Sequence, residues 1–262
     1  MTSLTGTSLA DAGFDAVALK PASVDVTRAR DLSVETLTVD YEGHKHVPDA
    51  ETLGALAADN TVRVTAPVRA DGYDPRGDDE QLRALPADVG LVAVAGNGAY
   101  LTDRERSRAV APRLGEVVAR ADDPWVGTEG IERLALAAGG TQYQLLASRT
   151  EADVRALRAA GFDGEIAVYA PTVLTTDTDA VLDAVAAYAA RRPAVADALP
   201  PDPPTDATAT GDVRERLLAG CREYALVGSA ETVADRIDRL REAGVDHVVG
   251  YPARGLDPFL GR

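Results

Sequence analysis

The densest group of reactive side chains is the segment DYEGHKH, residues 40–46, which holds two of the three histidines of the chain. The apolar and β-branched run at 34–39 directly before it is typical of a buried strand. Histidine titrates near neutral pH, so His44 is suited to transfer a proton, and Asp40 is suited to orient its ring. We predict Asp40 and His44 as catalytic residues; an exposed polar loop without a role is the alternative.

Residues at strand ends also suggest two other kinds of site, a metal site and a Schiff-base lysine. Asp40, His44 and His46 raise the question of a metal site, but an i, i+2 spacing on a loop defines no coordination geometry, and no metal is predicted. Lys20 follows the first predicted strand and is one of two lysines in the chain. A Schiff-base aldolase using Lys20 is an alternative, and an ordinary ion pair is the simpler reading.

The segment VGTEGI, residues 126–131, is a glycine turn that leads into a predicted helix. Such a turn presents unpaired amides and the positive end of the helix dipole, which together favour an anion. We predict that Gly127, Thr128, Gly130 and Ile131 form an anion-binding turn. Acidic residues at 129 and 132 oppose this assignment, and a plain helix start is the alternative.

Eight strand-like runs must position these residues, and they alternate with helical stretches, which favours a parallel sheet covered by helices. The runs are 14–19, 34–39, 61–66, 89–95, 124–127, 143–147, 165–170 and 245–251, and the helical stretches are 49–58, 103–120, 131–138, 151–160 and 179–191. Eight parallel strands close a barrel. An open doubly wound sheet is the competing fold, but no GxGxxG follows the first strand.

The residue pattern near the end of the chain predicts one complete helix followed by one strand. Ser229 is a suitable N-cap, Gly244 is a suitable left-handed stop, and the strand 245–251 follows at once. The sequence LRAAGFD at 157–163 recurs as LREAGVD at 240–246, which indicates a repeated helix-to-strand unit or convergence on the same turn chemistry.

Length and composition set the class of protein. With 262 residues, the chain is predicted as a single domain, 1–262, with a proline-rich excursion at 193–211 that proline keeps from forming helix. A net charge of −15 opposes nucleic acid and anionic lipid as partners. Strong acidity with two lysines also predicts a halophilic host. One cysteine, no long apolar run and an N-terminus without signal-peptide features predict a cytoplasmic protein.

Residues 124–252 carry a family resemblance. VGSAETVADRIDRLREAGVDHVVGYP looks like the C-terminal signature of the luciferase-like flavin and deazaflavin oxidoreductases, which include bacterial luciferase and methylenetetrahydromethanopterin reductase. PWVGTEGIERLALAAGGTQYQLL and EIAVYAPTVLTTDTDAVLDAVAAYAARRP are similar to preceding strand and helix units of that family. The chain is identified as a divergent, haloarchaeal-type member.

The resemblance implies a luciferase-like (β/α)8 TIM barrel that binds coenzyme F420 or FMN at the C-terminal ends of its strands. It implies hydride transfer on an unidentified small-molecule substrate, and a homodimer is compatible with it. The turn at 127–131 then becomes the candidate for the cofactor phosphate, although the family commonly places proline and a basic residue where this chain has Ile131 and Glu132. The alternative is a barrel of this family that has lost its cofactor and serves a non-redox or non-catalytic role.

Overall fold

The computed structural model describes residues 12–260. The prediction that the N-terminus lacks signal-peptide features concerns residues that lie mostly outside this range. The strands are β1 (Ala16–Leu19), β2 (Thr36–Val39), β3 (Thr61–Pro67), β4 (Val89–Val94), β5 (Trp125–Gly127), β6 (Thr141–Leu145), β7 (Ile166–Leu174), β8 (Leu226–Gly228) and β9 (His247–Pro252).

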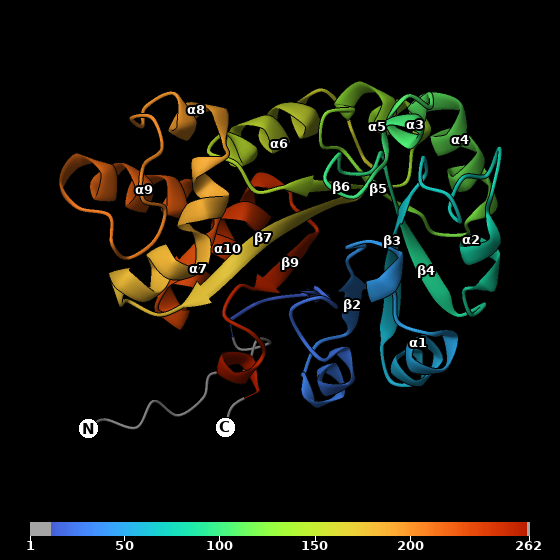
Figure 1. The fold of residues 1–262 in the computed structure, drawn as a ribbon, viewed down its shortest axis with the longest axis horizontal. Helices are drawn as coiled ribbons and strands as arrows, with labels where there is room; N and C mark the ends of the chain where they lie inside the picture. Colours follow the sequence, from blue (N-terminus) through green and yellow to red (C-terminus); the bar gives the residue numbers. More distant parts are fainter. Residues whose placement is uncertain (1–11, 261–262) are drawn as a thin grey trace. The chain divides into compact units, whose positions relative to one another are not determined.

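Helices separate most of these strands (Figure 1). The α-helices are α1 (Ala50–Ala57), α2 (Glu80–Ala84), α3 (Asp103–Arg106), α4 (Val110–Arg120), α5 (Glu132–Ala138), α6 (Thr150–Ala159), α7 (Thr178–Ala190), α8 (Pro193–Ala196), α9 (Gly211–Tyr224) and α10 (Ala230–Ala243). Short 3-10 turns are η1 (Val26–Asp31), η2 (His44–His46) and η3 (Asp257–Phe259). The alternation of parallel strands with helices confirms the predicted (β/α)8 barrel fold, to which the three-residue β8 is an addition.

The described chain divides into two compact units, one made of residues 15–144 and 163–167, the other of residues 12–14, 145–162 and 168–260. In the first unit the strand order is β6-β5-β4-β3-β2-β1 and every pair is parallel. Leu19 pairs with Val39, Val39 with Val64, and Pro67 with Val94. The loops after β1, β2, β3 and β4 therefore leave from the same edge of the sheet.

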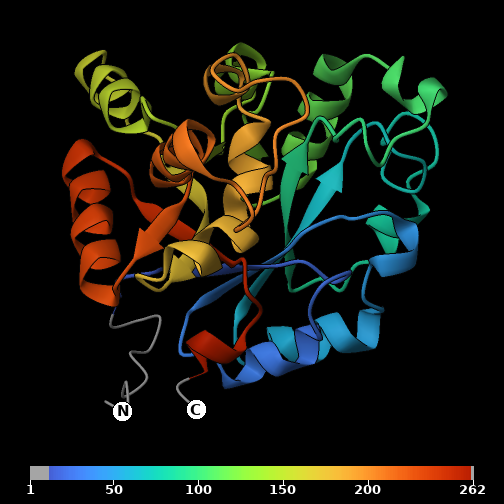
Figure 2. The ribbon, with the colours of Figure 1, turned by 60° about the vertical axis from the view of Figure 1, so that its left-hand side comes forward.

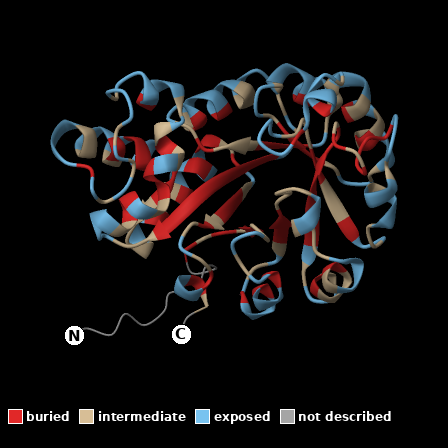
Figure 3. Ribbon diagram, in the orientation of Figure 1, coloured by how far each residue is buried: buried red, intermediate tan, exposed pale blue. Residues whose placement is uncertain are grey.

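The outer face of this sheet carries the core of the first unit. Ala93 of β4 and Val126 of β5 are fully buried with Leu114 and Val117 of α4 and with Ala135 of α5. Figure 3 shows the burial pattern that results, in which the strands are buried and the helices expose their outer sides. Burial of these apolar faces is what holds the helices on the sheet.

In the second unit β7 lies between β9 and β8, and Thr172 pairs with Leu226. Helix α7 packs against α9 through buried residues such as Leu182 and Leu217, and α10 packs against α6 and β8 (Figure 2). Ser229 caps α10 as predicted, because its Oγ accepts a bond from the Thr232 amide at 3.2 Å. Gly244 ends α10 with a φ of 108°.

The two copies of the repeated sequence form the same turn. Gly161 and Gly244 both have positive φ, and the amide that follows each bonds back to a leucine carbonyl, Phe162 to Leu157 and Val245 to Leu240, both at 3.1 Å. This is the bonding pattern of a Schellman helix end. Arg158 of the first copy donates from Nη2 to the Gly244 carbonyl at 2.8 Å, so one copy of the repeat also supports the other.

Several predicted boundaries differ from the structure, among them the end of the strand predicted at 165–170, which continues to Leu174. The helix predicted at 103–120 is broken into α3 and α4, because Pro112 cannot share a helix with the carbonyl four residues before it. Strand β6 starts two residues earlier than predicted, since Gly139 and Gly140 have φ values of 81° and 73° and turn the chain directly into it. The proline-rich excursion contains a helical turn, α8, which Pro193 begins at a position where no amide is needed.

Candidate functional site

The loop after β2 is fastened to the neighbouring strand ends by its first residues. The Asp40 amide donates to the Leu19 carbonyl at 2.8 Å, which joins the ends of β1 and β2. The Glu42 carboxylate accepts a bond from the Ala22 amide at 2.8 Å, which joins the two following loops. Asp40 is half-buried, and the chain then forms the 3-10 turn η2 with His44 exposed. The structure thus places both predicted catalytic residues at the C-terminal edge of the sheet.

His44 lies in a group of aromatic rings that we call the aromatic cluster: Tyr41, His44, Tyr73 and Tyr100. The His44 ring is edge-on to Tyr41 with centroids 5.6 Å apart and stacked on Tyr73 at 6.5 Å. Tyr41 is also edge-on to Tyr73 at 5.4 Å and to Tyr100 at 6.5 Å. Edge-to-face pairs at these distances are favourable beyond their buried area. The loops after β2, β3 and β4 are therefore linked by ring contacts.

The aromatic cluster has a buried base and an exposed rim. Tyr73 is fully buried, Tyr41 is half-buried, and Tyr100 keeps 44% of its surface exposed. The hydroxyls of Tyr41 and Tyr73 are buried, and no described residue forms a hydrogen bond with either. Burial raises the pKa of both phenols to about 12, with the Glu105 carboxylate adding to the shift at Tyr41. Buried hydroxyls without partners are uncommon in proteins and mark this position for a ligand or water.

The raised pKa values of Tyr41 and Tyr73 predict how the free energy of unfolding depends on pH in the alkaline range. Between a pKa of 10.0 for an ordinary phenol and about 12 in the folded chain, the unfolded state loses protons that the folded state keeps. Stability is therefore expected to fall as pH rises through this window. Urea denaturation at about pH 9 and about pH 11 measures the fall. A Tyr41→Phe, Tyr73→Phe double variant should lose less stability over this interval; an equal loss would contradict the assignment.

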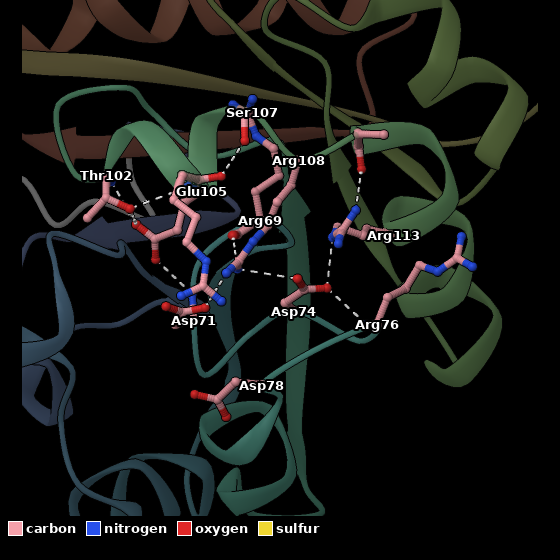
Figure 4. Close-up of polar contacts among 12 residues, drawn as sticks. Arg69, Asp71, Asp74, Arg76, Asp78, Thr102, Glu105, Ser107, Arg108 and Arg113 are labelled. Atoms are coloured by element: carbon pink, nitrogen blue, oxygen red, sulfur yellow. Dashed lines mark hydrogen bonds and ion pairs between the residues drawn. The ribbon is translucent and has the colours of Figure 1, made fainter.

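The loop that carries Tyr73, residues 68–79, is built around a buried carboxylate (Figure 4). Asp74 is 2% exposed, and its Oδ1 accepts bonds from Arg113 Nε at 2.8 Å and from the Arg76 amide at 2.9 Å. Its Oδ2 lies 3.3 Å from Arg108 Nη1, and Arg108 Nη2 bonds Asp71 at 2.5 Å. A buried charge with this many donors is satisfied on all sides, so Asp74 organises the loop and is not available to a substrate.

Glu105 of α3 is the second anchor of the same loop. Its carboxylate accepts bonds from the Asp71 amide at 2.8 Å and from the amide and hydroxyl of Thr102, both at 2.7 Å. Burial by itself raises the pKa of Glu105, but these hydrogen bonds outweigh it and lower the pKa. The pair with Thr102 is also a capping box that starts α3. Glu105 therefore stays ionised while it holds the loops after β3 and β4 together.

The predicted anion-binding turn lies at the end of β5, in the same unit. Its amides already have partners: Thr128 donates to the Tyr143 carbonyl at 3.0 Å, and Ile131 donates to the Thr128 carbonyl at 2.9 Å. The Gly130 amide donates to the Glu132 carboxylate at 3.2 Å. Gly127 is buried, and a Cβ there would meet Val94 at 2.7 Å, so glycine is required by packing. The Glu132 carboxylate therefore already binds one of the amides that the sequence predicts for an anion.

Other polar and aromatic side chains near the strand ends have structural partners. The Arg69 guanidinium donates to the carbonyls of Ala95, Gly96 and Arg106 at 2.7 to 3.0 Å. Trp125 is 3% exposed and lies under the Arg63 guanidinium at 4.7 Å, so it is a core residue of the sheet interior. Within residues 12–260, no three His, Cys, Asp or Glu side chains gather as they would around a metal ion. In the same range, no helix is both long and apolar enough to span a membrane.

Sequence reasoning missed Tyr73, Tyr100 and Glu105. All three follow β3 or β4 by several residues, in loops whose course depends on contacts with other loops. The available signal was positional: in parallel sheets, residues after the carboxyl ends of neighbouring strands meet at one edge. Applied to the segments 68–79 and 95–105, that rule selects Tyr73 and Tyr100 as companions of Tyr41.

Comparison with solved structures shows the class of fold. An F420-dependent secondary alcohol dehydrogenase, in complex with an F420-acetone adduct, has a TM-score of 0.58 at 16% identity and covers 94% of each chain. The coenzyme F420-dependent tetrahydromethanopterin reductase from Methanopyrus kandleri has a TM-score of 0.61 at 12% identity, over 94% of this chain and 95% of its own. Apo-MsnO8 has a TM-score of 0.55 at 16% identity, over 94% and 96%. The chain has the luciferase-like (β/α)8 barrel fold.

A family model matches residues 9–259, which is nearly the whole chain. The protein belongs to this family, a family of unknown function (DUF7388). No curated protein matches the sequence significantly. Since the structural matches are below 25% identity, they establish the fold of this chain but not its chemistry.

Proposed function

We propose that this chain is an oxidoreductase that uses coenzyme F420 or FMN to transfer a hydride to or from a small molecule. Two proteins that share its fold over 94% of the chain are F420-dependent by name. The observation that carries the proposal is the aromatic cluster at the C-terminal edge of the sheet. It combines an exposed histidine, a partly exposed tyrosine and two buried phenol hydroxyls that have no hydrogen-bond partner within residues 12–260.

The aromatic cluster fits a planar ring. The exposed rim of His44 and Tyr100 offers flat surfaces for contact, and Tyr41 and Tyr73 fix that rim from below. The buried hydroxyls of Tyr41 and Tyr73 supply hydrogen-bond donors at a place where residues 12–260 provide no acceptor. When bound, a deazaflavin or flavin supplies the hydride chemistry that side chains cannot perform. The residues that hold its ring would be Tyr41, His44 and Tyr100.

The contribution of the chain to the reaction is proton transfer. Hydride loss from an alcohol carbon requires that its hydroxyl also lose a proton, and a neutral ring nitrogen of His44 would accept it. In the reverse direction the protonated ring would return it. Asp40, which lies at the start of the same loop, stays our candidate for orienting His44. Packing of the ring against Tyr41 and Tyr73 limits its rotation and so favours one orientation toward the reacting atom.

The turn at Gly127, Thr128, Gly130 and Ile131 fits the cofactor phosphate less well, because the Glu132 carboxylate bonds the Gly130 amide. Removing the Glu132 carboxylate should free the Gly130 amide and reduce the electrostatic repulsion of the cofactor phosphate. We therefore expect Glu132→Ala to strengthen binding of F420 by about threefold to tenfold, or 0.6–1.4 kcal/mol. Equilibrium titration measures it. Glu129→Ala changes the same charge and is the matched control; equal effects would indicate general electrostatics and place the phosphate elsewhere.

Titration with F420 and with FMN tests the function itself. High salt is the appropriate condition, since the acidic composition with only two lysines predicts a halophilic host. We expect at least one of the two to bind more tightly than about 100 μM, roughly 5.5 kcal/mol. If neither does so, the redox proposal is wrong.

A second function class has support from one observation. The internal partners of the Gly130 and Ile131 amides are what a barrel that has lost its phosphate site would show. Such a protein would be a non-redox or non-catalytic relative. It would bind neither cofactor, and Glu132→Ala would not create binding, so the same titrations separate the two classes.

A further inference from the structure

A cavity of about 90 Å³ lies in the second unit, where α9 ends, β8 passes and α10 begins. Its lining includes the polar residues Arg222, Thr232, Arg236 and Arg239, together with Leu226 and Val227 of β8. One water molecule needs roughly 10–15 Å³ by this kind of measure, so the cavity has room for a small polyatomic group.

The cavity is locally cationic in a chain whose net charge is −15. Arg239 Nε lies 3.9 Å from the Glu151 carboxylate, but Glu151 also pairs with Arg155 at 3.6 Å. In the part of the chain that the structure describes, no ion pair joins Arg222 or Arg236 to a carboxylate. Glu151 and Glu223 are the two carboxylates whose charges act on the Arg236 guanidinium. Three arginines therefore line one small space, and their charges are incompletely compensated.

Arg236 is held in position by the end of α9. It donates from Nη1 to the Arg222 carbonyl and from Nη2 to the Glu223 carbonyl at 3.5 Å, so it caps carbonyls of the last helical turn. Its buried Nε has no hydrogen-bond partner among the described residues. Burial lowers the pKa of the Arg236 guanidinium, and repulsion from Arg239 adds to the shift while Glu151 opposes it. The capping role explains Arg236, and Arg239 donates from Nη1 to the Asp235 carbonyl at 3.2 Å, but neither contact explains why Arg222 lines the same cavity.

We propose that this cavity binds one tetrahedral oxyanion of the phosphate class. Planar guanidinium groups present paired donors that match phosphate oxygens, and several of them around one space favour a multivalent anion over chloride. Thr232 also lines the cavity, and its hydroxyl, which lies 2.9 Å from the Ser229 hydroxyl, can donate a hydrogen bond. The anion is either free phosphate or the terminal group of a small phosphate monoester, which share this chemistry. The proposal does not depend on the redox function, because none of its residues belongs to the aromatic cluster or to the turn at 127–131.

Isothermal titration of the full chain with inorganic phosphate, in chloride at constant ionic strength, tests the site. We expect one saturable site with a Kd of about 1 mM or tighter. Arg222→Gln and Arg239→Gln should each weaken binding at least tenfold, whereas Arg216→Gln, an exposed arginine on the same helix as Arg222, should change it less than twofold. Arg222 and Arg239 are the informative positions because they are exposed and lack the helix-capping bonds of Arg236.

A parallel titration with glycerol 3-phosphate distinguishes the source of the anion: tighter binding than phosphate indicates a monoester ligand, and equal binding indicates free phosphate. The proposal is overturned if phosphate shows no saturable binding. It is also overturned if equimolar chloride displaces phosphate completely, or if Arg222→Gln and Arg239→Gln both bind phosphate like the unmodified chain.

Discussion

Replacing Asp74 with alanine is expected to lower the free energy of unfolding by about 3–5 kcal/mol. The carboxylate is 2% exposed and accepts bonds from Arg113 Nε and the Arg76 amide, with Arg108 as a third cationic neighbour. Its removal leaves two arginine side chains, 12% and 16% exposed, without their buried counter-charge. Loss of one partner from a buried ion pair is costly because the remaining charge stays desolvated. Urea denaturation at constant salt measures the change.

Asp103→Ala is the matched control for this substitution. Asp103 also pairs with an arginine, Arg106, but its side chain is 93% exposed and the pair is three residues apart on α3. Exposed pairs contribute between zero and about 1 kcal/mol, so the control should fall within that range. If Asp74→Ala costs no more than Asp103→Ala, Asp74 does not organise the loop at 68–79. The position of Tyr73 in the aromatic cluster would then need another explanation.

Replacing His44 with alanine is expected to lower turnover by 10²–10⁴-fold while cofactor affinity changes much less. The range is that of a general acid or base positioned by the protein. The assay is reduction of bound F420 by a panel of secondary alcohols, followed as loss of oxidised deazaflavin absorbance. Selective loss of turnover separates proton transfer from ring contact, since loss of a ring contact alone would weaken cofactor binding.

His46→Ala is the control for this prediction, because His46 belongs to the same 3-10 turn and is half-buried beside it. We expect it to keep turnover within about threefold. A His44→Ala protein that turns over at the unmodified rate would remove the histidine from the mechanism. Equal losses in both variants would indicate that the turn at 44–46 is needed only for local structure.

Local patterns predicted the strands and most helices well because each depends on nearby residues. Ser229 and Gly244 bound α10 through bonds within a few positions of themselves, and the sequence shows both residues. The helix predicted at 103–120 is interrupted because Pro112 lies inside a strongly amphipathic run and breaks its hydrogen-bond ladder. The early start of β6 followed from two adjacent glycines with positive φ, which a hydrophobic pattern does not register.

The candidate site was predicted less completely because its parts are joined over long sequence distances. The loop at 40–46 stood out by composition, and the strand register places it at the sheet edge as expected. The partnership of His44 with Tyr73 depends on a loop that Asp74, Arg108 and Arg113 fold back, and no local pattern shows that an arginine 39 residues away will meet Asp74. The Glu132 carboxylate on the Gly130 amide likewise depends on a side-chain orientation that the sequence leaves open.

Hydrogen exchange with and without saturating F420 tests the central claim most directly, because it reports binding and its location together. If the aromatic cluster holds the deazaflavin ring, amides in the segments 40–46 and 68–79 should exchange more slowly in the presence of F420. Slower exchange confined to other segments, or unchanged exchange throughout the chain, would contradict the account.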